Sequence, residues 1–87
     1  MSEEHWLINS SRSKVKRFRR NIQNKDKFFE YVFIYSGKIM QILRQQPPVM
    51  TTRQEIKIDE TREEWKKFIS QGWRRTSVVL QIKYSHS

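Results

Sequence analysis

Hydrophobic residues in this chain occur in short clusters separated by charged and polar stretches, a spacing typical of short β-strands. The most apolar cluster, residues 28–35, is rich in aromatic and β-branched side chains and carries Glu30 as its one charged residue. A strand that is apolar on both faces is usually central in a sheet, with other elements packed on each side. Ser36-Gly37 follows as a tight-turn signal, so we expect residues 38–43 to form its hairpin partner.

A second hairpin is predicted near the N-terminus. Residues 5–8 form a short apolar strand, residues 9–13 are turn formers, and residues 14–20 return as a second strand. The pairing of that second strand is poorly specified, because Val15 and Phe18 have opposite parity and cations fall on both faces; a β-bulge between the two residues is one way to bring both to one face.

The remaining pattern adds a loop, a linker and two more strands. Residues 21–27 are polar and predict a loop, and Gln-Gln-Pro-Pro at residues 45–48 predicts a stiff, extended linker. Residues 53–58 are a further short strand candidate. Residues 77–84 predict a final strand because they alternate cleanly, with one face formed by Val78, Leu80, Ile82 and Tyr84.

One amphipathic helix is predicted near residues 60–71. Asp59 or Thr61 is the expected N-cap, and Thr61 has a glutamate three residues later, the spacing of a capping box. Gly72 falls where a left-handed residue ends a helix, and Trp73 is expected to fold back onto Phe68 in a Schellman motif. The apolar stripe at helical spacing consists of Thr61, Trp65, Phe68 and Ile69.

These elements predict one α+β domain, a small antiparallel β-sheet of about four to six short strands with the helix packed on it. A partly closed small barrel with the helix as a plug is the alternative architecture. The domain is expected to span residues 1–87, with residues 1–4 and 85–87 as frayed tails.

Composition supports a folded domain with a small core. A chain of 87 residues buries roughly 60–65% of the surface that its unfolded form exposes, and three Trp, three Tyr and five Phe supply large buried areas. The sequence has no cysteine, which excludes disulfide bonds and thiolate metal sites and is typical of a reducing cytoplasm. The longest apolar run, residues 31–35, is too short to cross a bilayer. We therefore expect a soluble, cytoplasmic protein without a transmembrane segment.

The strongest functional signal is a basic cluster at residues 12–20. Six of these nine residues are cationic and none is acidic, in a chain of net charge +9. Like charges this close repel one another unless an anionic surface lies against them, so the cluster indicates a polyanionic partner, with nucleic acid as the leading candidate. An exposed Phe18 would add base stacking, whereas a core Phe18 would leave phosphate contacts alone. The candidate nucleic-acid-binding residues are Lys14, Lys16, Arg17, Phe18, Arg19, Arg20, Lys25, Lys27, Arg74 and Arg75.

Other interpretations of the cluster stay open. A strand rich in lysine and arginine also occurs as an ordinary solvated edge that discourages sheet aggregation. An acidic protein or an anionic membrane surface would satisfy the same charges, and the predicted strand at residues 77–84 offers an edge for self-association. Among nucleic acids, RNA or single strands are favoured over duplex DNA, because no predicted helix is basic enough to read a major groove.

The sequence does not predict an enzyme. His5 and His86 are the two histidines, and both lie in terminal segments without the spacing of a metal site. Glu60, Glu63 and Glu64 crowd the first turn of the predicted helix, where interaction with the helix dipole accounts for them. We therefore expect no catalytic residue, no metal and no cofactor.

Three short motifs carry a family resemblance. Trp-Leu-Ile-Asn stands at residues 6–9, Val-Lys-Arg-Phe at residues 15–18, and Gly-Trp-Arg-Arg at residues 72–75, where it closes the predicted helix. With these motifs the chain resembles domain of unknown function 1651, a family of short proteins from marine picocyanobacteria, over roughly residues 5–76. The resemblance implies no catalytic or binding residue, since the family has no assigned function.

Overall fold

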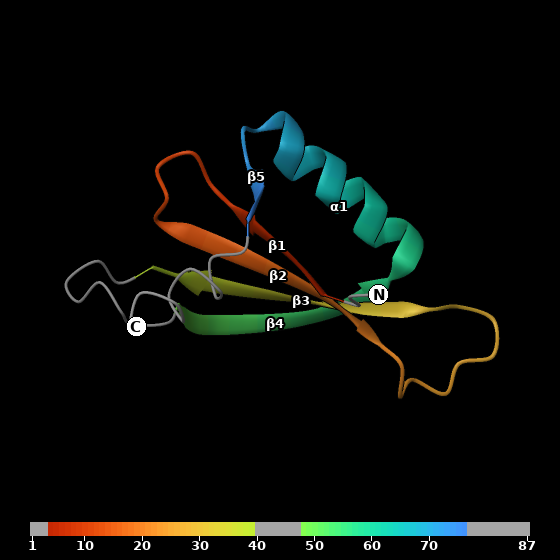
Figure 1. Cartoon of the computed structure of the whole chain (residues 1–87). Coiled ribbons are helices and arrows are strands. Elements are labelled where there is room, and N and C mark those ends of the chain that lie inside the picture. Colours follow the sequence, from red (N-terminus) through yellow and green to blue (C-terminus); the bar gives the residue numbers. More distant parts are fainter. Residues whose placement is uncertain (1–3, 40–47, 77–87) are drawn as a thin grey trace.

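The computed structural model describes residues 4–39 and 48–76, which form five antiparallel strands in one sheet and one helix (Figure 1). The strands pair in the order β4-β3-β2-β1-β5, and the described sheet is open, with β4 and β5 at its two edges. This arrangement confirms the predicted α+β fold. The elements are β1 (Glu4–Ile8), β2 (Lys14–Asn21), β3 (Tyr31–Lys38), β4 (Val49–Lys57), α1 (Ile58–Ser70) and β5 (Arg74–Thr76).

The main core lies between the sheet and α1, and we call this side of the sheet the inner face. Its buried residues, none more than 7% exposed, are Leu7, Phe18, Val32 and Ile34. Trp65 and Phe68 of α1 pack against them, with ring centroids 5.1 and 6.4 Å from that of Phe18. The helix therefore buries the middle of the sheet with its apolar stripe.

The predicted bulge between Val15 and Phe18 is wrong. β2 pairs with β1 and β3 in unbroken register, so the two side chains point to opposite faces. Both are buried because a second, smaller apolar cluster lies on the side away from α1, which we call the outer face. This cluster consists of Ile8 and Val15, with Trp6, Ile39 and Met50 packed against them.

The predicted turn at Ser36-Gly37 is also wrong. Both residues lie inside β3, and Lys38, predicted to begin the return strand, is the last residue of β3. β3 pairs with β2 on one side and with β4 on the other, and the register between β3 and β4 shifts at Ser36/Gly37, as at a β-bulge. A Cβ on Gly37 would lie 3.0 Å from the carbonyl oxygen of Val49, so the glycine serves close strand pairing rather than a turn.

Residues 28–30 belong to a loop rather than to the predicted strand, because the Asp26 carboxylate turns the backbone there. Its Oδ1 accepts hydrogen bonds from the amides of Phe28 (2.8 Å) and Phe29 (3.3 Å), and its Oδ2 accepts one from the Tyr31 hydroxyl (2.9 Å). The bonds from the Phe28 amide and the Tyr31 hydroxyl lower the pKa of Asp26. Phe28 is left 87% exposed.

The start of α1 differs from the prediction. The helix begins at Ile58, and its N-cap is Lys57, which makes no side-chain cap. Asp59 lies within the first turn, and the Thr61 hydroxyl donates a hydrogen bond to the Lys57 carbonyl oxygen at 3.1 Å instead of capping an amide. Neither predicted cap is therefore correct.

The end of α1 confirms the predicted Schellman motif. The Trp73 amide donates to the carbonyl of Phe68 (3.0 Å), the Gly72 amide donates to that of Ile69 (3.1 Å), and the rings of Phe68 and Trp73 lie 5.2 Å apart. Ile69 leaves the predicted stripe and is 43% exposed, because it lies about 100° around the helix from Phe68.

Replacing Gly72 by alanine is expected to lower the free energy of unfolding by about 1 kcal/mol. Gly72 has φ = 97°, a value that L-residues rarely adopt, while the space around its missing Cβ is open. The cost is therefore backbone strain rather than a clash. Urea denaturation measures it, with Gly72→Asn as the milder control because Asn tolerates left-handed backbone. An alanine variant as stable as the wild type would contradict this account.

The element boundaries correct two further predictions. Glu4, predicted to be part of a frayed tail, is the first residue of β1, and β4 begins at Val49, before the predicted strand at residues 53–58. No helix of the described residues is long and apolar enough to cross a membrane. Predictions that lie outside the described residues are those for residues 1–3, 40–43, 45–47, 77–84 and 85–87.

Candidate nucleic-acid interface

The outer face carries two rows of side chains that cross four neighbouring strands. In each row the residues are direct partners in the sheet register, and residues two apart on one strand share a face. Both rows therefore lie on the side away from Phe18 and α1. The first row is Trp6, Arg17, Tyr35 and Arg53; the second is Glu4, Arg19, Phe33 and Glu55.

Rings and guanidinium groups in these rows lie against one another. The Arg17 guanidinium carbon lies 5.7 Å from the Trp6 ring centroid and 5.2 Å from that of Tyr35. The Arg53 guanidinium carbon lies 4.7 Å from the Phe33 ring centroid, which is 5.9 Å from that of Tyr35. The three rings are half-buried and Arg53 is exposed. We call these five residues the aromatic–arginine patch.

Glu4 holds one end of the patch in position. Its Oε2 accepts a hydrogen bond from Arg17 Nη2 at 2.5 Å, and its Oε1 accepts one from Trp6 Nε1 at 3.0 Å. Burial raises the pKa of the Glu4 carboxyl, but the two hydrogen bonds and the charges of Arg17 and Arg19 outweigh burial, so the pKa is lowered. Arg17 is thus an oriented cation that separates two aromatic rings.

The lowered pKa of Glu4 predicts a pH dependence of stability. A carboxyl whose pKa is lower in the folded state contributes stability above its unfolded-state pKa and loses it as pH falls through the folded-state pKa. Glu4→Gln is therefore expected to lower the free energy of unfolding by about 0.5–1 kcal/mol at pH 7. Urea titrations at several pH values should show this difference disappearing in acid, below the usual pKa of glutamate. A difference that persists at the lowest pH would contradict the role of the charge.

Comparison with known protein families shows to which family this chain belongs. Residues 4–79 match the family model described as protein of unknown function (DUF1651), a range that includes every described strand and the helix. The chain belongs to the DUF1651 family. No curated protein and no solved structure matches it.

In this DUF1651 protein the predicted binding residues of β2 divide between the two faces. Arg17 and Arg19 lie on the outer face, whereas Lys14, Lys16 and Arg20 have the parity of Phe18 and lie on the inner face. Phe18 is 4% exposed under the Trp65 ring, so it offers no surface for a base and its assignment as a binding residue is wrong. The basic cluster is therefore not one continuous surface.

Two of the inner-face cations contact neighbouring side chains of the fold. Lys16 Nζ donates to Ser36 Oγ at 2.7 Å and lies 5.2 Å from the Phe68 ring centroid. Burial lowers the pKa of Lys16, and the nearby charge of Glu64 opposes that effect. Arg20 forms an ion pair with Glu30.

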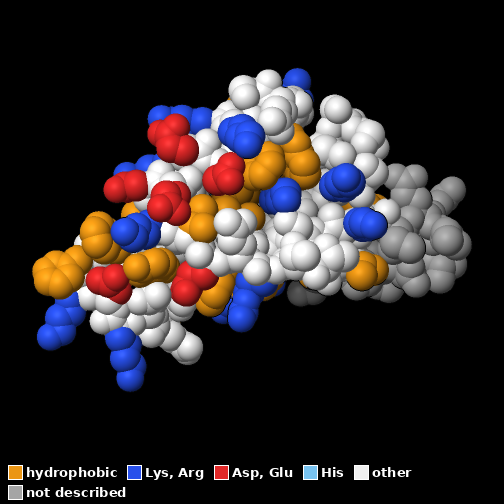
Figure 2. All heavy atoms as spheres, turned by 180° about the vertical axis from the view of Figure 1, so that it is seen from behind, with side chains coloured by type: hydrophobic (Ala, Val, Ile, Leu, Met, Phe, Trp, Pro, Cys, Tyr) orange, Lys and Arg blue, Asp and Glu red, His pale blue; other side chains and the backbone are white. Residues whose placement is uncertain are grey.

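The remaining predicted cations lie in the loop between β2 and β3 and on the edge strand β5. Lys25 and Lys27 are exposed in the loop at residues 22–30, which protrudes with apolar side chains at its tip (Figure 2). Arg74 and Arg75 lie on β5, which follows α1 directly and pairs with β1. Arg74 is opposite Ile8, and Arg75 is opposite Leu7.

Sequence reasoning missed Phe33, Tyr35 and Arg53 as members of a surface. A signal for the rings was present, because residues 31, 33 and 35 are aromatic while residues 32 and 34 are aliphatic, which predicts one aromatic and one aliphatic face. Arg53 had no local signal. It joins the patch only through the register between β3 and β4.

The helix side and the outer face of the sheet differ in the distribution of their charges. On α1, acidic and basic residues are mixed, and acidic side chains gather near the end with the protruding loop (Figure 2). The outer face of the described strands carries the cations Arg17, Arg19, Arg53, Lys57 and Arg74 against the carboxylates Glu4 and Glu55. Within the described ranges, no group of three or more His, Asp or Glu is arranged to hold a metal ion.

Proposed function

We propose that this DUF1651 protein binds RNA or another single-stranded nucleic acid on the outer face of its sheet and does so without catalysis. The observation that carries the proposal is the alternation of aromatic rings and guanidinium groups across four strands. Stacking of one base on an aromatic side chain is worth about 1–3 kcal/mol, and guanidinium groups pair with phosphates. The proposal includes a cytoplasmic location, which a sequence without cysteine favours.

The arrangement favours a single strand over a duplex. Unstacked bases expose the faces that aromatic rings contact, whereas bases within a duplex do not. The described helix carries four acidic residues, Asp59, Glu60, Glu63 and Glu64, so it is poorly suited to a major groove. Sequence preference is expected to be weak, because every base has a face that can stack.

Salt dependence of binding tests the proposal. Three phosphate contacts predict a slope of about −2 in a plot of log affinity against log salt, or roughly a 20-fold loss between 50 and 200 mM salt. Fluorescence anisotropy of a labelled 12-nucleotide RNA of mixed sequence measures it. Absence of binding at 50 mM salt would overturn the proposal.

Charge-matched variants distinguish the two faces. Arg19→Ser with Arg53→Ser removes two outer-face cations and is expected to reduce the slope by about 1.4. Lys14→Ser with Lys38→Ser removes the same charge from paired positions on the inner face and is expected to change the slope little. Arg17 and Arg20 are left intact because both form ion pairs. Equal losses in the two double variants would mean that net charge alone attracts RNA.

A protein partner is the alternative that the sequence raised. Docking of an acidic protein or self-association by edge pairing would not require the rings of the aromatic–arginine patch. Edge pairing would also show weak salt dependence and an oligomeric state that changes with concentration. Sedimentation analysis of the protein alone, at two concentrations and two salt levels, separates self-association from RNA binding.

A further inference from the structure

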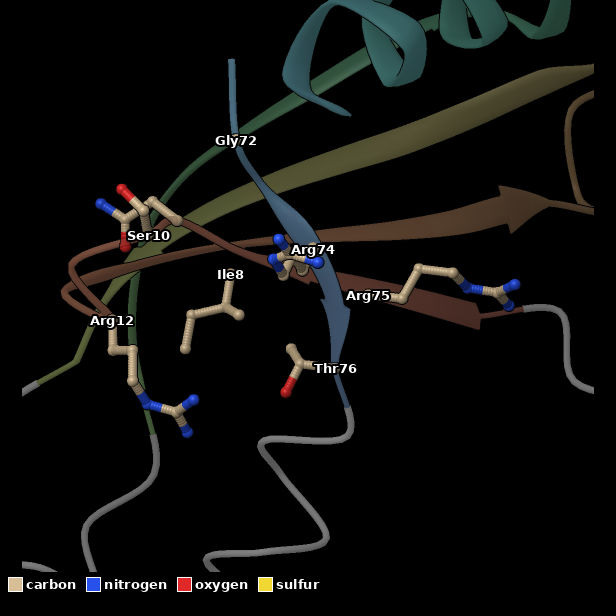
Figure 3. A pocket seen from close by; sticks show the side chains of 8 residues that line it. Ile8, Ser10, Arg12, Gly72, Arg74, Arg75 and Thr76 are labelled. Atoms are coloured by element: carbon tan, nitrogen blue, oxygen red, sulfur yellow. The ribbon is translucent and has the colours of Figure 1, made fainter. Parts of the chain in front are cut away.

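A hollow of about 440 Å³ lies where the β1–β2 turn meets the start of β5 (Figure 3). Ile8 forms part of its lining, and Ser10, Arg12, Arg74 and Thr76 surround it. The described residues that line it include arginines and polar side chains and contain no aspartate or glutamate. An anion is therefore the kind of ligand that its charge favours.

Local structure fixes the turn that supplies Arg12. The Asn9 side-chain oxygen accepts hydrogen bonds from the amides of Ser13 and Lys14, both at 2.9 Å. The Arg12 amide donates to the Asn9 carbonyl oxygen at 3.0 Å, and Arg12 has φ = 58°. These bonds place the Arg12 side chain beside Ile8 and Thr76 in the hollow (Figure 3).

Arg74 is positioned by the sheet. Arg74 comes directly after the Schellman turn. Its direct partner on β1 is Ile8, so the Arg74 side chain lies on the outer face of the sheet. Arg75 points to the other side, away from Ile8 in Figure 3, where its Nη2 lies 3.3 Å from His5 Nδ1. Arg75 also lines the hollow, but its guanidinium group lies next to His5, so we assign the hollow to the guanidinium groups of Arg12 and Arg74.

The hollow adjoins the aromatic–arginine patch. Thr76 is the direct partner of Trp6, and Ile8 follows Trp6 by two residues on the same face of β1. A nucleic-acid strand that lies along the row from Arg53 to Trp6 thus reaches the hollow where it passes over β5, the edge strand of the described sheet.

We propose that this hollow binds the terminal phosphate monoester of the nucleic-acid strand that lies on the patch. The inference rests on the proposed function. A terminal monoester carries nearly two negative charges at pH 7, compared with one on a phosphodiester inside the strand. Two guanidinium groups with neighbouring hydroxyls match the larger charge and the additional oxygen acceptors.

Oligonucleotides that differ only at their ends test this inference. A 10-nucleotide RNA is prepared with a 5′-phosphate, with a 3′-phosphate, or with hydroxyls at both ends, and its affinity for the full chain is measured by competition anisotropy. One phosphorylated form is expected to bind about tenfold more tightly than the hydroxyl form. Arg74→Gln is expected to abolish that preference, so that the phosphorylated and hydroxyl forms bind this variant with equal affinity.

The outcomes separate this inference from the proposed function. Equal affinity of all three RNAs for the wild type would overturn the terminal-phosphate site and leave the sheet-face proposal standing. No binding of any RNA would overturn the sheet-face proposal. In that case a ¹⁵N-HSQC titration with inorganic phosphate, at an ionic strength matched with chloride, tests the hollow directly. Selective shifts of the Ser10, Arg74 and Thr76 amides would support an anion site, and shifts no larger than those with chloride would exclude it.

Discussion

Replacing Phe33 and Tyr35 together by alanine is expected to weaken binding of single-stranded RNA by roughly 100-fold. The two rings lie 5.9 Å apart on the outer face, and each stacked base is worth about 1–3 kcal/mol. Arg53 would also lose the ring above which it lies. Anisotropy titration at 50 mM salt measures the loss, and circular dichroism verifies that the variant is folded.

A matched control removes the same kind of side chain elsewhere. Phe28 and Phe29 are exposed in the loop at residues 22–30, outside the rows of the patch, so Phe28→Ala with Phe29→Ala is expected to change affinity by less than about fivefold. A larger loss in the loop variant than in the Phe33/Tyr35 variant would assign stacking to the loop and contradict the account. Tyr35→Leu adds a further control, because leucine keeps the apolar volume without the aromatic face.

Replacing Phe18 by alanine is expected to lower the free energy of unfolding by about 3–5 kcal/mol. The Phe18 side chain is 4% exposed and packs against Trp65 and Phe68, so its removal leaves a cavity in the main core between the sheet and α1. A domain of 87 residues typically has a stability of about 4–13 kcal/mol, so the variant loses a large part of the total.

Urea denaturation tests the Phe18 prediction, with Arg19→Ala as the neighbouring control. Arg19 is exposed on the opposite face, and its replacement is expected to change stability by less than about 0.5 kcal/mol. RNA binding by the fraction of Phe18→Ala that remains folded should equal that of the wild type. A stable Phe18→Ala protein that no longer binds RNA would return Phe18 to the binding surface and contradict its place in the core.

Local patterns predicted the parts of the fold that depend on local interactions. The hairpin at residues 5–8 and 14–20 follows from its turn formers, and the helix end follows from Gly72 and Trp73. The turn at Ser36-Gly37 was predicted wrongly because a glycine has the same local signature in a turn and in a bulge. Only the approach of Val49 from a distant strand distinguishes the two.

The candidate site was harder to predict because it is assembled by register. The charge density of residues 12–20 was visible in the sequence, but alternate residues of a strand point to opposite faces, and pairing decides which face α1 covers. Arg53 and Arg74 join the outer face through pairings that span long stretches of chain. Arg53 therefore had no local signal, whereas Arg74 was a candidate from its charge and only its face depended on the pairing.

The three tryptophans provide the most direct test of the central claim, that RNA binds the outer face. Trp6 lies in the patch, whereas Trp65 and Trp73 pack on the inner side. A ¹⁵N-HSQC titration with the 12-nucleotide RNA is expected to shift the Trp6 indole N–H and the amides of Tyr35 and Arg53, and to leave the Trp65 and Trp73 indoles unchanged. Shifts confined to Trp65, Trp73 and the amides of α1 would contradict the account.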